Sequence, residues 1–511
     1  MRLRRGTYSA IALVMMSVTS AAAEVRVTDR AGLMEALSAA SGGDRIVLAP
    51  GRYGKLDLSA KLFPWAAYAS AVTIASENAS QRGVFDTVSL SGVTNLHFNQ
   101  VTFDYVYAPG DKSHLNAVYV RGCSDIVIAN SLFDGDEAKG TGTPADGYGT
   151  GRGLTVEQSR RIRIEGNTFK TWLRGGIFST TSDLTVIGND MSDLRSDGMD
   201  FASVQNVLIE KNHIHDFRLA GGTGDHPDMI QFWTARTTEP SVNVTIRSNL
   251  LDQGAGGRSQ SIFIRNDRVD RGLAGEEMYY RNVRIENNLI RNGHIHGITV
   301  GETDTLAIVA NTLIQSVSVK EGGKVTRPAI NVNGPSRNVL IAKNVTPGLN
   351  TKGFNPTRNW SITANTIVQR DNPARADHYR NIFVNAEAAG RVTPADLRLL
   401  PGSAPALELL GSDYSRFEVK PQELDGYILH GPGSADPRRI KFDARNLYGP
   451  DGRVKAEDAM FEWDFGDGSK ASGPAPQHDY ARDGNFAVSV LAVLKDGRKV
   501  TLNKTVAISR D

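Results

Sequence analysis

One short stretch of the chain combines residue types that transfer protons with types that bind sugars. It reads Gly-Asp-His-Pro-Asp-Met-Ile-Gln-Phe-Trp and ends at Trp233. His226 can donate or accept a proton near neutral pH, Asp228 can act as acid, base or cation ligand, and the Trp233 ring is a platform for a sugar. A histidine between two aspartates has no obvious stabilising purpose here. We therefore expect a functional site in this stretch.

Further candidates lie on either side of it. Two carboxylates, Asp197 and Asp200, precede the stretch, and together with Asp228 they form a candidate calcium site. Arg265 is a natural partner for a carboxylate on the substrate. The candidates for the base or acid are Lys211, His226 and Tyr279. The candidates for substrate binding are Gln231, Trp233, Tyr279 and His296.

A repeat must position these residues. One phrase, alternating apolar residues followed by Asn, recurs along most of the chain. The asparagines are spaced by 21 to 39 residues, and the shortest steps cluster at 21 to 23. Such a period with strand-like alternation predicts the coils of an all-β solenoid, in which stacked asparagines satisfy turn backbone groups. The members are Asn130, Asn167, Asn189, Asn212, Asn249, Asn288, Asn311, Asn344 and Asn365.

A second apolar strand precedes each asparagine phrase, and its third residue is predicted to face solvent. Stacking then brings six candidates onto three consecutive coils: Asp197, Asp200, Asp228, Gln231, Trp233 and Arg265. The outward row is predicted to contain Thr155, Phe178, Asp200, Gln231, Phe263, Thr299 and Asn331. Because Asp228 and Arg265 are predicted to be exposed, replacing either by Ala is expected to remove turnover with little loss of stability.

The ends of the chain differ from this repeat. Residues 1–23 have positive charges, a short apolar run and small residues, a pattern typical of a cleaved signal peptide. We expect a secreted or periplasmic protein with a helix over 31–40 that caps a β-helix of residues 24–400. Residues 401–437 are predicted to be a linker, and 438–511 a separate module. The single cysteine, Cys123, forms no internal disulfide.

Composition excludes two classes of partner. Lys plus Arg number 58 against 56 Asp plus Glu, without a basic block, so we expect no nucleic acid. No run after the signal is long and apolar enough to span a membrane. We expect a monomer whose partner is an acidic polysaccharide.

Two stretches resemble known families. The helix followed by Gly-Asp-Arg-Ile-Val-Leu-Ala-Pro-Gly-Arg-Tyr, ending at Tyr53, resembles the entry segment of secreted polysaccharide-acting β-helices. This resemblance implies a right-handed parallel β-helix. The segment Phe-Glu-Trp-Asp-Phe-Gly-Asp-Gly-Ser, ending at Ser469, and the later His-Asp-Tyr480 resemble a PKD domain. That resemblance implies an immunoglobulin-like sandwich that acts as a spacer or adhesion module.

Three reactions fit the candidate residues. The layout looks most like that of alginate or pectate lyases, which implies β-elimination of a uronic-acid polymer. The Asp-His-Pro-Asp run is similar to a site of mannuronan epimerases, and C5 epimerisation is the second reaction. Ser-Asp-Gly-Met-Asp, ending at Asp200, is similar to a polygalacturonase motif, and hydrolysis by paired acids is the third. A non-catalytic polysaccharide-binding or adhesion protein is the alternative of another class.

Overall fold

The computed structural model describes residues 22–316, 327–387, 393–413, 424–433, 436–449 and 452–508. The predicted signal peptide, residues 1–23, lies almost entirely outside them. The chain divides into two compact units: one holds Met1–Arg195 with two short later segments, and the other holds most of the chain from Ser196 to Asp511. No helix among the described residues has the length and apolar content needed to cross a membrane.

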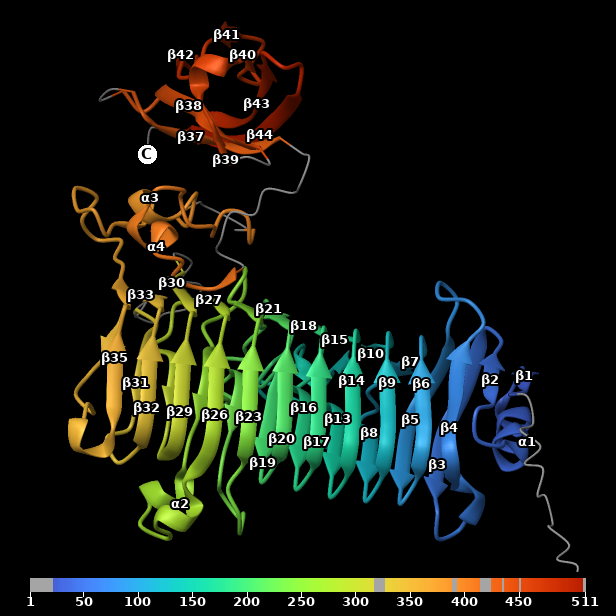
Figure 1. Ribbon diagram of the computed structural model, residues 1–511. Coiled ribbons are helices and arrows are strands. Elements are labelled where there is room, and N and C mark those ends of the chain that lie inside the picture. The colour runs from blue at the N-terminus through green and yellow to red at the C-terminus, as the bar shows by residue number, and fades with distance from the viewer. Residues whose placement is uncertain are drawn as a thin grey trace, which may run out of the picture. The chain divides into compact units, whose positions relative to one another are not determined.

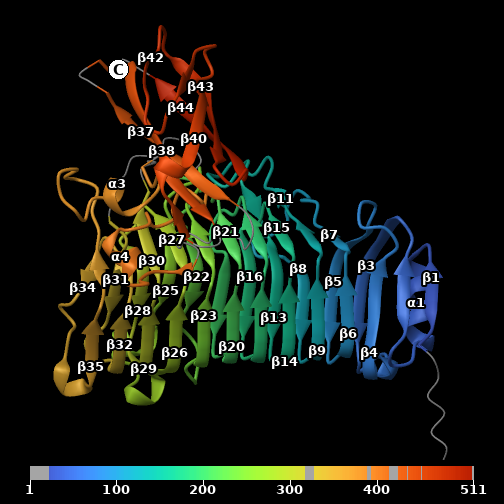
Figure 2. The ribbon, with the colours of Figure 1, turned by 45° about the horizontal axis from the view of Figure 1, so that its top comes forward.

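The first unit is a stack of parallel strands that begins with a helical cap (Figures 1 and 2). Helix α1 (Arg30–Ala39) follows β1 (Glu24–Val27), and Asp29 caps it by accepting from Gly32 N–H. Leu33 and Leu37 of this helix are buried, and its bounds lie within one residue of the helix expected over 31–40.

Each coil of the first unit contributes up to three strands in chain order. The first row is β3 (Gly51–Ser59), β5 (Gly83–Ser91), β8 (Asn116–Arg121), β13 (Arg152–Glu157) and β16 (Arg174–Ser179). The second row is β2 (Arg45–Leu48), β4 (Ala67–Ser76), β6 (Thr94–Asn99), β9 (Ser124–Ala129), β14 (Arg160–Glu165) and β17 (Ser182–Ile187). The third row is β7 (Thr102–Asp104), β10 (Leu132–Asp134), β15 (Thr168–Lys170) and β18 (Asp190–Ser192).

The second unit has a three-strand plan of its own. Its first row is β19 (Met199–Ala202), β22 (Asp228–Phe232), β25 (Gln260–Ile264), β28 (His296–Val300), β31 (Ala329–Val332) and β34 (Leu349–Asn350). Its second row is β23 (Val242–Arg247), β26 (Tyr280–Glu286), β29 (Thr303–Val309), β32 (Arg337–Ala342) and β35 (Trp360–Thr363). Its third row is β21 (His213–His215), β24 (Leu250–Asp252), β27 (Leu289–Asn292), β30 (Thr312–Gln315), β33 (Val345–Thr346) and β36 (Thr366–Ile367). The strand β20 (Gln205–Glu210) has residues in both units.

Asparagines form the predicted ladder at the turn after the second-row strands. In the second unit, Nδ2 of each donates to Oδ1 of the next at 2.8–3.0 Å. The residue before each ladder asparagine is left-handed, as at Lys211 (φ 56°). Asn130 is itself such a residue (φ 52°), and Ser131 takes the ladder position, donating its N–H to Asn167 Oδ1. The prediction that Asn130 belongs to the ladder is therefore wrong by one residue.

The first row shows where the predicted register holds. Asp200 pairs with Gln231, Gln231 with Phe263, Phe263 with Thr299, and Thr299 with Asn331, as predicted. In the first unit the register differs, because β16 starts earlier than predicted and Thr155 pairs with Ile177. Two residues of the first unit predicted to face solvent in this row are buried instead. Phe178 lies in the core, and Thr155 is buried with its hydroxyl bonded to Asn116.

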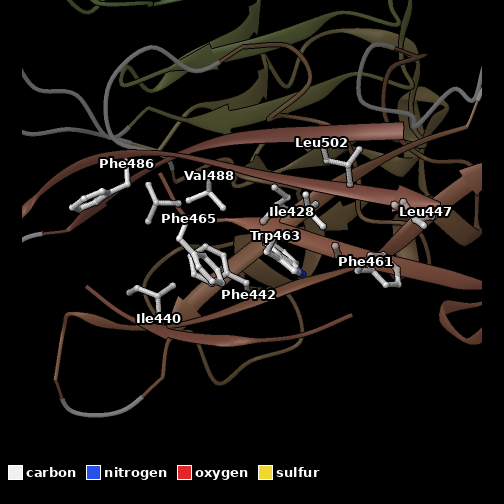
Figure 3. Close-up of a cluster of buried hydrophobic side chains, with 14 of the residues drawn as sticks. Ile428, Ile440, Phe442, Leu447, Phe461, Trp463, Phe465, Phe486, Val488 and Leu502 are labelled. Atoms are coloured by element: carbon white, nitrogen blue, oxygen red, sulfur yellow. The ribbon is translucent and has the colours of Figure 1, made fainter. Parts of the chain in front are cut away.

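The C-terminal module is a β-sandwich. One sheet contains β37 (Asp425–Pro432), β38 (Arg439–Gly449), β39 (Gly452–Val454) and β42 (Gln477–Asp479); the other contains β40 (Ala459–Asp464), β41 (Lys470–Ser472), β43 (Gly484–Leu494) and β44 (Lys499–Ile508). Trp463, Phe442 and Phe465 pack together in its core (Figure 3). The first strand begins at Asp425, inside the predicted linker.

Candidate active site

Two carboxylates and one imidazole meet at the start of neighbouring first-row strands. Asp228 is the first residue of β22, and Asp197 lies two residues before β19. The backbone N–H of Asp228 donates to Asp197 Oδ1 at 3.1 Å, and the N–H of Gly198 donates to the carbonyl of Asp228 at 2.8 Å. One ligand atom each from Asp197, His226 and Asp228 lies within 4.8 Å of the others. We call these three residues the Asp–His cluster.

The cluster joins buried acids to an accessible base. Asp197 and Asp228 are fully buried, whereas the side chain of His226 is 67% exposed. His226 Nδ1 lies 3.2 Å from Asp228 Oδ2. The hydrogen bond to Asp228 raises the pKa of His226, partial burial opposes this, and the negative charges of Asp228 and Asp197 add to the increase. With Nδ1 donating to Asp228, neutral His226 keeps Nε2 as a proton acceptor.

Burial corrects the predicted exposure of this surface. Asp200 and Asp228 were predicted to face solvent, but both are fully buried, and Gln231 is 9% exposed. Stacked side chains in a row of parallel strands lie about 4.8 Å apart and cover one another, which alternation within one strand does not reveal. For Asp228, the side chain of His226 adds a further cover.

Two of the three predicted calcium ligands belong to the Asp–His cluster. Carboxylate oxygens are the ligands that calcium prefers, and Asp197 and Asp228 supply them close together. Among the described residues, Asp200 does not belong to this group of ligand atoms; its strand partner is Gln231. The third member is His226 instead, whose nitrogen is a poorer calcium ligand.

Sequence reasoning left Gln260 out of the site. Gln260 is the first residue of β25 and pairs with Asp228 across the two strands. Its Oε1 and the neighbouring Ser259 Oγ are buried, and neither has a hydrogen-bond partner among the described residues. Buried polar atoms of this kind are rare in folded proteins and are often satisfied by water or ligand. The sequence could have indicated Gln260, because it occupies the same strand-start position of the repeat as Asp228, one coil further on.

Trp233 and Arg265 lie at the other end of the strands. Trp233 is five residues beyond Asp228, a distance of about 16 Å along an extended strand. Arg265 Nε contacts Asp270 Oδ2 at 3.0 Å and Asp267 Oδ1 at 3.5 Å, so nearby carboxylates balance its charge. The predicted exposure of Arg265 is confirmed, since its side chain is 47% exposed.

The structure does not bring Lys211 or Tyr279 to the Asp–His cluster. Lys211 occupies the left-handed turn position between β20 and β21, where its N–H donates to Arg247. Tyr279 precedes β26 and is 6% exposed, and burial raises its pKa. His226 lies in the loop before a first-row strand. Lys211 lies in a turn after a second-row strand, and Tyr279 lies just before a second-row strand.

His296 starts strand β28, in the same row of strand starts as Asp228 and Gln260. Its ring lies 4.9 Å from that of Phe263 and 5.1 Å from that of His294. His294 was missed from the sequence, although the alternation His-Ile-His places both imidazoles on the same side. The row therefore runs from two acids through an amide to a pair of imidazoles.

The chain belongs to the family described as right handed beta helix region, which it matches over residues 86–372, more than half of its length. Residues 432–509 match the PKD domain. These matches establish an all-β protein in which a parallel β-helix is followed by a PKD sandwich.

Similar proteins have varied names. A microbial collagenase of Vibrio alginolyticus is 34% identical over 70 residues, which span 14% of this chain and 8% of that protein. The Dettilon tailspike protein shares 11% identity with a TM-score of 0.44, covering 94% of this chain and 90% of its own. A PL6 family polysaccharide lyase from Pseudopedobacter saltans shares 12% identity with a TM-score of 0.36, covering 68% and 92%.

Proposed function

We propose that this is an exported polysaccharide lyase that cleaves a uronic-acid-containing polymer by β-elimination. The observation that carries the proposal is the contact between exposed His226 and buried Asp228 at 3.2 Å. Elimination needs a base for the C5 proton and a positive charge to offset the sugar carboxylate. We assign the base to His226, and a cation held by Asp197 and Asp228 would supply the positive charge.

In this proposal, Nε2 of His226 removes the C5 proton, the electron pair forms a C4–C5 double bond and the C4–O bond breaks. The leaving oxygen takes a proton from water. Asp228 accepts from Nδ1, which fixes the ring and stabilises the imidazolium that forms. Because Asp228 is fully buried, few alternative positions are open to its carboxylate, and the imidazole is held at the edge of the wall.

The carboxylates of Asp197 and Asp228 are proposed to hold a calcium ion beside the reacting sugar. When bound, calcium would neutralise the uronate carboxylate and so acidify the C5 proton. Calcium selects oxygen over nitrogen, so His226 stays available for proton transfer. Gln260, one coil further on, is proposed to hydrogen-bond a sugar hydroxyl.

A substrate panel tests this proposal. The full chain is incubated with alginate, pectin, glucuronan and bacterial exopolysaccharides, with calcium or with a chelator, and ultraviolet absorbance of unsaturated uronate is followed. We expect absorbance with at least one polymer, and its loss in the chelator. If no polymer yields it, elimination is refuted; proton exchange at C5 without cleavage would identify an epimerase, and retardation without turnover a binding protein.

Hydrolysis is the second candidate, favoured by the short separation of the acids. Carboxyl groups about 5 Å apart are typical of retaining glycosidases, and the Asp197 and Asp228 oxygens lie within 4.8 Å. Reducing ends released without ultraviolet absorbance would identify this reaction.

A further inference from the structure

One and two coils beyond Asp228, aromatic side chains replace the acids on the same wall. Phe263 on β25 is half-buried, and Ile295, in the turn before β28, is 47% exposed. His294 and His296 flank Ile295, and their rings lie 5.1 Å apart. An exposed isoleucine beside aromatic rings offers an apolar surface of the kind on which the flat face of a sugar packs.

A backbone hydrogen bond fixes the tautomer of His294, and the contact with Thr299 is the basis for assigning that of His296. The backbone N–H of His296 donates to His294 Nδ1 at 3.2 Å, so Nδ1 of His294 carries no proton. Thr299 Oγ1 accepts from Asn331 Nδ2 at 3.1 Å and lies 2.8 Å from His296 Nδ1, so we assign its hydroxyl proton to that nitrogen. Each neutral ring then carries its proton on Nε2.

The surroundings keep these rings neutral. Burial, with smaller electrostatic contributions from His296 and Arg258, lowers the pKa of His294 to about 4. Burial also lowers the pKa of His296. Two neutral N–H donors beside an apolar surface suit sugar hydroxyls, whereas tight binding of a carboxylate favours a charged partner.

We propose that Phe263, His294, Ile295 and His296 form a subsite that binds a sugar residue by its apolar face and hydroxyl groups rather than by a carboxylate. The inference rests on the proposed function, because it takes the polymer to lie along the row of strand starts. Successive strands are about 4.8 Å apart, so the subsite lies about 10 Å from Asp228. The substrate class is then a heteropolysaccharide in which a neutral sugar lies near the reacting uronate.

Binding measured without turnover tests the subsite. The full chain with His226→Ala is titrated calorimetrically with neutral tetrasaccharides (cello-, manno- and laminaritetraose) and with tetragalacturonate and tetramannuronate. We expect at least one neutral probe to bind. His294→Leu or His296→Leu should weaken its binding roughly three- to tenfold, the loss of one hydrogen bond. Phe263→Leu should weaken it similarly, whereas uronate binding should change less than twofold.

The matched control is His114→Leu, because His114 is an exposed histidine in a loop of the first unit. It should leave all affinities unchanged. The subsite is overturned if no neutral probe binds, or if the histidine variants weaken uronate binding as much as neutral binding. Failure of the proposed function would show separately, as the absence of unsaturated product from the wild-type chain with every uronate polymer.

Discussion

The carboxylate of Asp228 is fully buried, yet its Oδ2 lies 3.2 Å from Nδ1 of His226, whose side chain is 67% exposed. In the proposed proton transfer, buried Asp228 would hold the imidazole in position and exposed His226 would reach the substrate. The aspartate belongs to a strand of the wall, and the imidazole belongs to the loop that precedes this strand.

Replacing His226 by Gln should abolish turnover without unfolding the chain. A general base typically contributes about 10²- to 10⁴-fold to the rate, and the side chain is mostly exposed, so Tm should stay close to that of the wild type. Initial rates on the cleaved polymer and a thermal melt measure the two effects. Unchanged kcat in the variant would remove His226 from the mechanism.

Replacing Asp228 by Asn should lower both activity and stability. Asp228 is buried and in contact with His226, and changing a buried hydrogen-bonded group costs about 1–3 kcal/mol. Urea denaturation measures the loss. This outcome differs from that expected for an exposed carboxylate, and a stability equal to that of the wild type would contradict the burial seen here. Arg265→Ala, at an exposed position, serves as the comparison and should lose less than about 1 kcal/mol.

The titration of His226 should respond to calcium. In chelator, the hydrogen bond to Asp228 holds the pKa of His226 above its usual value of about 6.5. Because the folded-state pKa is raised, the stabilising contribution is present below about pH 6.5 and is lost as pH rises through the folded-state pKa. Calcium at Asp197 and Asp228 should lower the pKa by repelling the proton.

Proton NMR of the His226 ring, assigned by comparison with His226→Gln, follows the shift. Asp197→Asn should reduce the pKa increase, because Asp197 contributes to it by charge alone. A pKa that calcium does not move would argue against calcium binding at these carboxylates.

Removing an interior member of the asparagine ladder should destabilise the β-helix more than removing its last member. Asn288 is fully buried; its Nδ2 donates to Ile246 and Asn311, and its Oδ1 accepts from Asn249. Asn288→Ala should cost at least about 2 kcal/mol by leaving buried groups unsatisfied. Asn365→Ala, at the partly buried end, should cost less. Thermal melts of both variants give the order, and equal losses would show that the burial of Asn288 does not set its contribution to stability.

The repeat let the sequence predict the fold and the stacking of Asp200, Gln231 and Phe263, because each copy of the phrase repeats the same backbone conformation. It misplaced Asn130 and Phe178, where an adjacent residue of similar type fits the phrase equally well. At Asn130, a left-handed turn residue shifts the repeat by one position. Before Phe178 stand two consecutive glycines, and the sequence does not show which of them pairs with the neighbouring strand.

The candidate site was predicted less completely for a different reason. Burial of Asp228 arises from a loop and from neighbouring coils, and alternation along one strand carries no information about either. Lys211 and Tyr279 were grouped with the site because their separation along the chain does not reveal on which turn of a coil a residue lies. His294 was overlooked although the His-Ile-His alternation places its ring on the same side as that of His296.

The asparagine-to-asparagine bonds stay at 2.8–3.0 Å in the second unit, although the chain between successive ladder members in that unit varies from 21 to 39 residues. Segments between the rungs can therefore lengthen, shorten or be exchanged while the frame keeps its spacing. In such a scaffold, the loops can change while the stacked strands stay the same. Related chains can therefore acquire new ligands through altered loops, and foreign loops can be grafted at the same points.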